Sequence, residues 1–323
     1  MVAFAKPDGS YDYEVGKELK ALRAYSKLPG KEDRAIPAKT RDRLLLATWN
    51  IANLGVQDRR PKDYELIAEI IGWFDLVAIQ ETNNDLKGLR GIQEQLPSRY
   101  KALFSDPGGN EERYAFLFDS ERVELLEEVG RVTVPPKDLP SVKLPGVSRK
   151  FEGFDRNPYL ASFQAKALTF VLADVHLYFG KDDEAALERR CLEAFAIGRW
   201  ADHRNDDDDA LTQNVLALGD FNLPVRDPSD PVFAALTAKG LRLPPHSTKV
   251  GGSNLNDDAQ YDQMGVFPGP MEEAIERSGV FDFDGALFRD LWGAGSEKEQ
   301  SKFRAYVRYY LSDHRPLWTA LSI

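Results

Sequence analysis

Short, wholly apolar runs alternate with segments of helical periodicity along most of this chain. Residues 44–51 (LLLATWNI), 75–81 (DLVAIQE) and 215–223 (VLALGDFNL) are each predicted to be a strand buried on both faces, because a half-exposed strand would alternate apolar with polar residues. Residues 64–74 instead place apolar side chains three and four positions apart, which is the spacing of one helix face. The pattern therefore predicts buried strands connected by amphipathic helices.

The middle of the chain is richer in strands. Residues 114–119 and 123–134 are predicted strands, and the Asp119-Ser120 step between them resembles a hairpin turn. Residues 135–158 carry many Pro, Gly and charged residues and are predicted to be a loop. Further strands are expected within residues 160–177 (two strands), at 261–267 and at 316–321, and further helices at 86–96, 183–203 and 232–239.

Strands outnumber helices in this pattern, and strands that are apolar throughout need cover on both faces. We therefore expect an α/β (α+β) fold in which two mixed β-sheets pack face to face with helices outside, a four-layer α/β/β/α sandwich. Residues 43–323 are expected to form this single domain. Residues 1–42 are polar and rich in Lys, Glu and Pro. They are predicted to be an N-terminal extension with one helix at 15–25, which Pro29-Gly30 would end.

The composition narrows the class of protein. Hydrophobic residues make up 42% of the chain and aromatic residues 11%, which supports a substantial core and excludes wholesale disorder. The single cysteine, Cys191, excludes an intramolecular disulfide framework and fits a reducing compartment. No secretory signal or membrane segment is visible, so we expect a cytoplasmic protein, and no feature indicates a protein partner. The net charge of −10 predicts weak, metal-assisted contact with a polyanion, not tight non-specific binding.

Polar residues recur directly after the apolar strand cores. They are Asn50, Glu81, His176, Asp220 with Asn222, and Asp313 with His314. Because a strand end fixes a side chain at the rim of a sheet, we expect these residues to gather at one rim of the sandwich. Phosphodiester hydrolysis needs oxygen ligands for a hard cation, donors that stabilise the charge of the transition state, and a base for water. This set of side chains supplies all three.

Eight segments carry a resemblance to a known superfamily. In chain order they are TWNIANLG, DLVAIQET, NEERYAFLFD, DRNPYLASF, LADVHLYFG, LALGDFNLP, QYDQMGV and LSDHRPLW. This order resembles the successive motifs of the endonuclease/exonuclease/phosphatase superfamily, and most closely its deoxyribonuclease-I-like branch. The resemblance covers residues 43–323, and GDFN and SDH are its most specific parts. It implies a phosphodiesterase dependent on Mg²⁺ or Mn²⁺, most closely a DNA endonuclease or exonuclease that uses in-line attack of water.

The resemblance also implies roles for the acidic and amide residues. Glu81 matches the principal metal-binding glutamate, with Asn50 and Asp313 beside the same ion. Asp220 and Asn222 match the GDxN pair, which contacts the attacking water and the phosphate. Asn50 is also expected near the phosphate. Which group takes the proton of the water stays open.

Two histidine–carboxylate pairs and one arginine complete the implied site. His314 matches the histidine of SDH, and Asp262 matches the aspartate that orients it. His176 matches the second histidine, and Glu112 matches its carboxylate partner. A carboxylate beside an imidazole fixes its tautomer and raises its pKa, so the ring can act as a donor or an acid. Arg156 matches an arginine near the scissile phosphate.

Two other classes of function stay open. The first is a phosphatase or phospholipase acting on inositol phosphates or sphingomyelin; against it, residues 260–263 are Gln-Tyr-Asp-Gln where the inositol phosphatases have Trp-Cys-Asp-Arg. The second is a non-catalytic binding protein on the same scaffold; against it, the chain keeps the metal-binding acids and both histidines. Two departures weaken the expectation of duplex cleavage. Asn110 stands where the deoxyribonuclease-I-like branch has a tyrosine, and residues 82–87 (TNNDLK) lack its minor-groove arginine.

Overall fold

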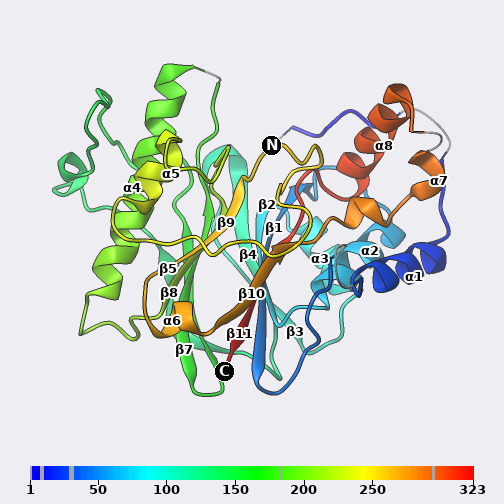
Figure 1. Cartoon of the computed structure of the whole chain (residues 1–323), viewed down its shortest axis with the longest axis horizontal. Coiled ribbons are helices and arrows are strands. Elements are labelled where there is room, and N and C mark those ends of the chain that lie inside the picture. Colours follow the sequence, from blue (N-terminus) through cyan, green and yellow to red (C-terminus); the bar gives the residue numbers. More distant parts are fainter. Residues whose placement is uncertain (1, 8–10, 29–32, 182, 293–294) are drawn as a thin grey trace.

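The strands of the protein form two sheets (Figure 1) in a computed structural model that describes residues 2–7, 11–28, 33–181, 183–292 and 295–323. The six-stranded sheet has the order β10-β11-β1-β2-β4-β3. Its members are β1 (Arg43–Leu54), β2 (Leu76–Asn83), β3 (Tyr100–Phe104), β4 (Glu112–Asp119), β10 (Ile275–Val280) and β11 (Leu317–Ser322). The five-stranded sheet has the order β5-β6-β7-β8-β9. Its members are β5 (Glu124–Arg131), β6 (Tyr159–Ala165), β7 (Leu168–His176), β8 (Val215–Asp220) and β9 (Asp262–Val266).

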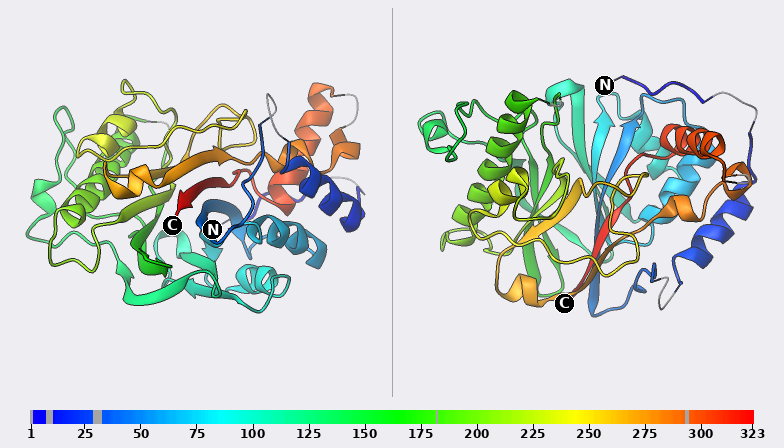
Figure 2. Two further views of the ribbon diagram at one scale, coloured as in Figure 1. Left: turned by 60° about the horizontal axis from the view of Figure 1, so that its bottom comes forward. Right: turned by 45° about the horizontal axis from the view of Figure 1, so that its top comes forward.

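Helices cover the outer face of each sheet (Figures 1 and 2). On the six-stranded side lie α1 (Val15–Tyr25), α2 (Pro61–Ile71), α3 (Lys87–Gln93), α7 (Arg289–Trp292) and α8 (Glu297–Tyr310). On the five-stranded side lie α4 (Glu184–Asn205) and α5 (Pro231–Thr237), while α6 (Pro270–Glu273) leads into β10. Each sheet is mixed, because β1 is parallel to β2 and β7 is parallel to β8. The predicted four-layer α/β/β/α sandwich is confirmed.

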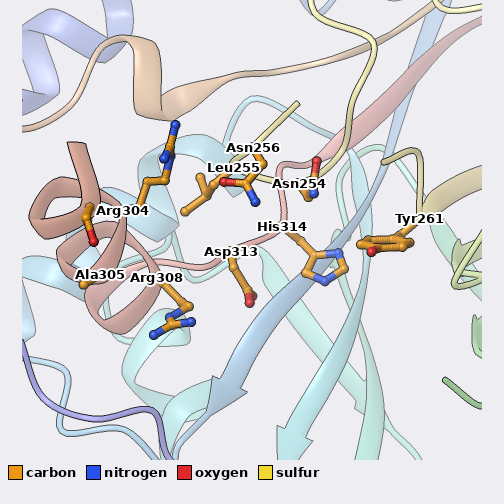
Figure 3. Close-up of a pocket in the computed structure, with 10 residues that line it drawn as sticks. Asn254, Leu255, Asn256, Tyr261, Arg304, Ala305, Arg308, Asp313 and His314 are labelled. Atoms are coloured by element: carbon orange, nitrogen blue, oxygen red, sulfur yellow. The ribbon is translucent and has the colours of Figure 1, made fainter. Parts of the chain in front are cut away.

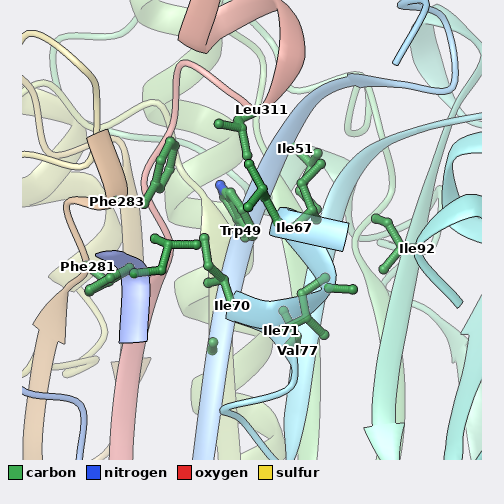
Figure 4. Close-up of a cluster of buried hydrophobic side chains, with 14 of the residues drawn as sticks. Trp49, Ile51, Ile67, Ile70, Ile71, Val77, Ile92, Phe281, Phe283 and Leu311 are labelled. Carbon is green, nitrogen blue, oxygen red and sulfur yellow. The ribbon is translucent and has the colours of Figure 1, made fainter. Parts of the chain in front are cut away.

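Side-chain alternation in the central strands explains their wholly apolar sequences. In β1, Leu44 and Leu46 pack against the other sheet, whereas Leu45 and Trp49 pack against the helices. Both faces of the strand are therefore apolar, as a strand between two packed layers requires. Figure 4 shows the helix-side cluster, in which Trp49 lies beside the apolar side chains of α2.

The predicted hairpin at Asp119-Ser120 is wrong. β4 pairs with β2 and β3 in one sheet, and β5 pairs with β6 in the other. Because β4 already has hydrogen-bonded neighbours on both sides, it has no free edge for β5. The turn after Asp119 instead carries the chain from one sheet to the other, and Arg122 anchors it by donating to Asp75 Oδ1 at 3.2 Å.

Several elements went unpredicted, among them β3, β10 and α8. α8 has a readable signal, because Phe303, Tyr306 and Val307 are buried at helical spacing. Ser296 and Glu299 also form a capping box at its start. The helix predicted at residues 15–25 is present as α1, and Pro29-Gly30 lie outside the described residues. None of the described helices combines the length and the apolar character that a membrane span requires.

A polar contact joins the two sheets at the end of their inner faces. Gln80 of β2 donates to Thr48 Oγ1 of β1 at 3.0 Å and also donates to Asp174 Oδ1 of β7. Asp174 is fully buried, and its Oδ2 has no hydrogen-bond partner. Burial therefore raises the pKa of Asp174 well above its ordinary value. This carboxyl group marks the boundary between the apolar layer and the polar residues of the rim.

Replacing Asp174 by Asn should change how stability depends on pH. The folded protein keeps a proton on Asp174 that the unfolded chain releases above about pH 4, so the free energy of unfolding falls as pH rises from there. Asp174→Asn cannot ionise, so we expect it to be more stable than the unmodified chain at about pH 8, with a smaller difference at about pH 4. Urea denaturation at both pH values measures this. The exposed Asp209→Asn is the control, and a parallel pH dependence of all three proteins would contradict the expectation.

Candidate active site

Strand register places three of the expected side chains next to one another. His176 at the end of β7 is paired with Asp220 at the end of β8, which is paired with Asp262 at the start of β9. Each of these side chains lies on the same face of its strand as the residues that pack between the sheets, such as Leu172 and Leu218. The three side chains therefore lie on the inner face at one end of the five-stranded sheet.

Asp220 lies at the centre of the candidate site. Its Oδ2 accepts a hydrogen bond from Asn50 Nδ2 at 3.0 Å. The Nε2 atoms of His176 and His314 lie 3.7 and 3.8 Å from the same oxygen. Burial alone would raise the pKa of Asp220, but the charges of His314 and His176 outweigh it and lower the pKa. Asp220 is therefore ionised at neutral pH and is shared by both imidazoles.

Each imidazole has a second carboxylate behind it. His314 Nδ1 lies 2.8 Å from Asp262 Oδ2, and His176 Nδ1 lies 3.0 Å from Glu112 Oε2. Burial would lower the pKa of His314, but the charges of Asp262 and Asp220 raise it well above its usual value. Burial would raise the pKa of Glu112, but its contact with His176 lowers it. The two expected histidine–carboxylate pairs thus lie on opposite sides of Asp220.

The backbone of the GDFN turn has conformations that favour glycine at residue 219 and asparagine at residue 222. Gly219 has φ 138°, and a Cβ there would lie 2.0 Å from the carbonyl oxygen of Val175 on the neighbouring strand. Only glycine allows β8 to approach β7 this closely next to the site. Asn222 has φ 50° and donates from Nδ2 to the carbonyl oxygen of Leu177 at 2.7 Å. Its backbone N–H also donates to Asp220 Oδ1 at 2.9 Å, which fixes that carboxylate.

Asn50, Glu81 and Asp313 form the candidate metal-binding set. Glu81, which has φ 58°, accepts from Asn50 Nδ2 at 3.0 Å and from the backbone N–H of Asn53 at 2.8 Å. Burial, together with the charge of Glu81, raises the pKa of Asp313. No group of three His, Cys, Asp or Glu side chains in the described part of the chain is arranged to hold a metal ion. The set instead combines two carboxylates with an amide.

The chemistry of this set fits a hard divalent cation. Asn50 Oδ1 is buried and has no hydrogen-bond partner, so this oxygen is available as a ligand. Carboxylate and amide oxygens are the protein ligands that Mg²⁺ prefers. A cation would also relieve the repulsion between Glu81 and Asp313 that contributes to the raised pKa of Asp313.

Arg156 lies behind the site. Its side chain is 5% exposed, and its guanidinium donates to the carbonyl oxygens of His176 and Leu177, both at 3.0 Å. Its Nε also lies 3.6 Å from Glu112 Oε2. These contacts hold the end of β7 and the carboxylate that backs His176. Direct contact of Arg156 with a phosphate stays a prediction.

The chain is similar in sequence to one curated protein. No family model matches the chain. A relative from Thioalkalivibrio sp. (strain K90mix), named Deoxyribonuclease, is 30% identical over 198 residues, which are 58% of this chain and 49% of that protein. The chain therefore spans about half the length of the curated relative that it matches.

Three solved structures share the architecture. An endonuclease/exonuclease/phosphatase family protein from Bacteroides thetaiotaomicron matches with a TM-score of 0.55 and 19% identity, covering 86% of this chain and 97% of that one. A mannosyl-6-phosphatase from B. thetaiotaomicron VPI-5482 matches with 0.55 and 18%, covering 87% and 100%. TDP2 from D. rerio, complexed with a single-strand DNA product, matches with 0.55 and 15%, covering 87% and 99%. The chain has the endonuclease/exonuclease/phosphatase fold.

A pocket of this protein opens beside Asp313, one of the candidate metal-binding residues (Figure 3). It has a volume of about 330 Å³ and is bounded by residues 254–256, one face of α8, and Asp313 and His314. Tyr261 also lines it, with its ring centroid 5.8 Å from that of His314. Sequence reasoning missed this pocket, because α8 was not predicted and Tyr261 was noted only as the residue before Asp262.

Sequence reasoning also assigned no role to Ser312, although this residue belongs to the SDH motif. It is fully buried, and its Oγ donates to the carbonyl oxygen of Asn50 at 2.7 Å. Ser312 Oγ also accepts hydrogen bonds from the backbone N–H groups of Ala52 at 3.1 Å and His314 at 3.0 Å. Ser312 therefore ties the segment that carries Asp313 and His314 to the end of β1.

Removing the hydroxyl of Ser312 should weaken both stability and the site. Ser312→Ala leaves two buried N–H groups without an acceptor, at a cost of about 1–3 kcal/mol. Urea denaturation measures the loss, and Ser98→Ala, at an exposed position, is the control. We also expect lower turnover, because His314 is no longer fixed relative to Asn50. An unchanged free energy of unfolding would contradict this role of Ser312.

Proposed function

We propose that this protein is a divalent-metal-dependent phosphodiesterase that hydrolyses DNA by in-line attack of water. One observation carries the proposal: two imidazole Nε2 atoms face the same carboxylate oxygen of Asp220, at 3.7 and 3.8 Å. Each imidazole is backed by its own carboxylate, Glu112 or Asp262. A phosphate group held between the two imidazoles would have a hydrogen-bond donor on each side. The ionised carboxylate of Asp220 would lie between these donors as an acceptor.

The roles of the chain's own residues follow from their charge. Asp220 has a lowered pKa, so it is ionised and can take a proton from the attacking water. The water oxygen bonds to phosphorus, and the bond to the leaving oxygen breaks. Its electron pair stays on the leaving oxygen, which takes a proton from solvent. Meanwhile negative charge accumulates on the phosphoryl oxygens. His314 has a raised pKa and is cationic, so it stabilises that charge, and His176 donates from the other side. Asn222 holds Asp220 in place through its backbone N–H.

Asn50, Glu81 and Asp313 would hold a Mg²⁺ or Mn²⁺ ion next to these groups. An ion held there would supply positive charge that offsets the negative charge of a phosphoryl oxygen. The donor set supports this assignment, since Asn50 Oδ1 is buried without a partner and the two carboxylates repel each other. Arg156, through the carbonyl oxygens of residues 176 and 177, positions His176 for the reaction.

DNA is the substrate that the likeness to other proteins favours. The relative named Deoxyribonuclease and the D. rerio TDP2 structure with a single-strand DNA product both support it. The mannosyl-6-phosphatase with the same fold keeps a phosphatase as the second candidate. A panel of supercoiled plasmid, single strands, RNA, an abasic duplex, an inositol phosphate and sphingomyelin, each with Mg²⁺, separates these substrates. Turnover of the phosphomonoester alone would replace the proposal by the phosphatase.

Loss of His314 or Asp220 should abolish most of the activity. Each removes a proton-transfer or electrostatic group, so we expect His314→Ala and Asp220→Ala to lower turnover of a DNA substrate at least about a hundredfold. His203→Ala, an exposed histidine on α4, is the matched control and should keep full activity. Near-normal turnover in both site variants, with plasmid nicking as the assay, would eliminate this assignment.

Metal dependence has a test of its own. EDTA should abolish turnover and added Mg²⁺ should restore it. Binding of Mn²⁺, followed by electron paramagnetic resonance, should weaken about tenfold or more in Glu81→Gln, because a charged ligand is lost. Glu297→Gln, exposed on α8, is the control for the change in net charge. Equal Mn²⁺ affinity in the Glu81 variant and the unmodified chain would remove Glu81 from the metal site.

A further inference from the structure

We propose that α8 supplies a second phosphate subsite, in which Arg304 and Arg308 bind a phosphate of the substrate strand next to the one that is cleaved. The inference rests on the proposed phosphodiesterase function and narrows its substrate to a nucleic-acid strand. It assigns a role to a helix that lies outside all eight segments that resemble the superfamily motifs.

The position of the two arginines is the first support. Arg304 and Arg308 are one helical turn apart, so they leave the same face of α8. Both line the pocket of about 330 Å³ whose wall also contains Asp313 and His314 (Figure 3). The opposite face of α8 is packed into the core through Phe303, among others. The helix therefore holds both side chains beside the proposed reaction centre.

The charge balance of the two arginines is the second support. The chain has a net charge of −10, and its other arginines commonly meet carboxylates, such as Arg23 with Glu69 and Arg315 with Asp284. Within the described residues, neither Arg304 nor Arg308 has a side-chain hydrogen bond or an ion pair. An acidic protein thus keeps, within its described residues, two cationic groups in one pocket that neither a hydrogen bond nor an ion pair engages, next to the groups that would bind a phosphate.

Arg308 contacts an aromatic ring in place of a carboxylate. Its guanidinium carbon lies 4.3 Å from the centroid of the Phe4 ring, which limits where the side chain can lie. Its Nε is buried and has no acceptor.

A strand fits this arrangement better than a small phosphate ester. A ligand with one phosphate can occupy either the reaction centre or the arginine pair, whereas a strand presents successive phosphates to both. Tyr261, which lines the pocket beside His314, also offers an aromatic side chain, and Phe179 next to it is 47% exposed. Aromatic faces of this kind stack with unpaired bases.

The decisive experiment measures binding without turnover. A fluorescein-labelled single-stranded oligonucleotide is titrated in EDTA, with anisotropy as the readout, at several salt concentrations. We expect Arg304→Ala/Arg308→Ala to bind about tenfold more weakly or worse, with the slope of log affinity against log salt reduced by about 0.7, the value for one lost phosphate contact on a single strand. Lys298→Ala/Lys302→Ala removes the same charge from exposed positions of α8 and should change binding less than about twofold. Equal affinity in both double variants overturns the subsite.

Turnover separates this inference from the proposed function. Bis(p-nitrophenyl) phosphate has a single phosphodiester, so the arginine variant should keep the unmodified rate on it while KM for the oligonucleotide rises. If the unmodified chain hydrolyses neither substrate but the binding result holds, the subsite stands and the proposed function fails. An equal loss on both substrates overturns the subsite, because the arginines would then act on the reaction centre or on folding. The single variant Arg304→Ala, whose side chain packs on no ring, gives the same test with less risk to folding.

Discussion

The packing of the two inner sheet faces is the constraint on which the rest of the structure depends. Side chains alternate along each strand, so every second residue of the central strands must fit against the opposite sheet. Leu46 and Phe116 from one sheet and Phe163 and Leu218 from the other meet in this way. The layer stays apolar over most of its length and turns polar only at one end. That end is where the candidate site lies, on side chains that the layer holds rigidly.

Burial at this end gives the polar groups their electrostatic character. A carboxylate such as Asp220 would be protonated in an apolar environment, but two imidazoles and the Asn50 amide compensate for the lost water. The same environment keeps His314 cationic through Asp262. Charges that partly neutralise one another in a place with little water interact more strongly than they would at the surface. A site of this kind needs no rearrangement to stabilise charge on a phosphate.

The acidic composition and a polyanionic substrate are compatible for a local reason. Net charge sets the field far from the protein, whereas recognition depends on the few groups at the pocket. Here Asp313 and the two arginines of α8, Arg304 and Arg308, line the same pocket. Such a protein binds its substrate only where cationic groups face the phosphates, which favours transient contact over tight non-specific binding.

The sequence by itself indicated most of the strands, the sandwich and the residues of the candidate site. Apolar runs require burial on both faces, and polar residues at the ends of parallel strands meet at one edge, so Asp220 and His176 were predictable neighbours. Tertiary structure decided the rest. β4 and β5 lie in different sheets because β4 has no free edge, Arg156 is buried behind the strands, and Ser312 ties the SDH segment to β1. The pocket beside α8 also formed only on folding, because it joins residues 254–256 to residues 301–308. Local pattern fixes which way a side chain points along its own strand or helix, but which distant element it meets depends on how the layers pack.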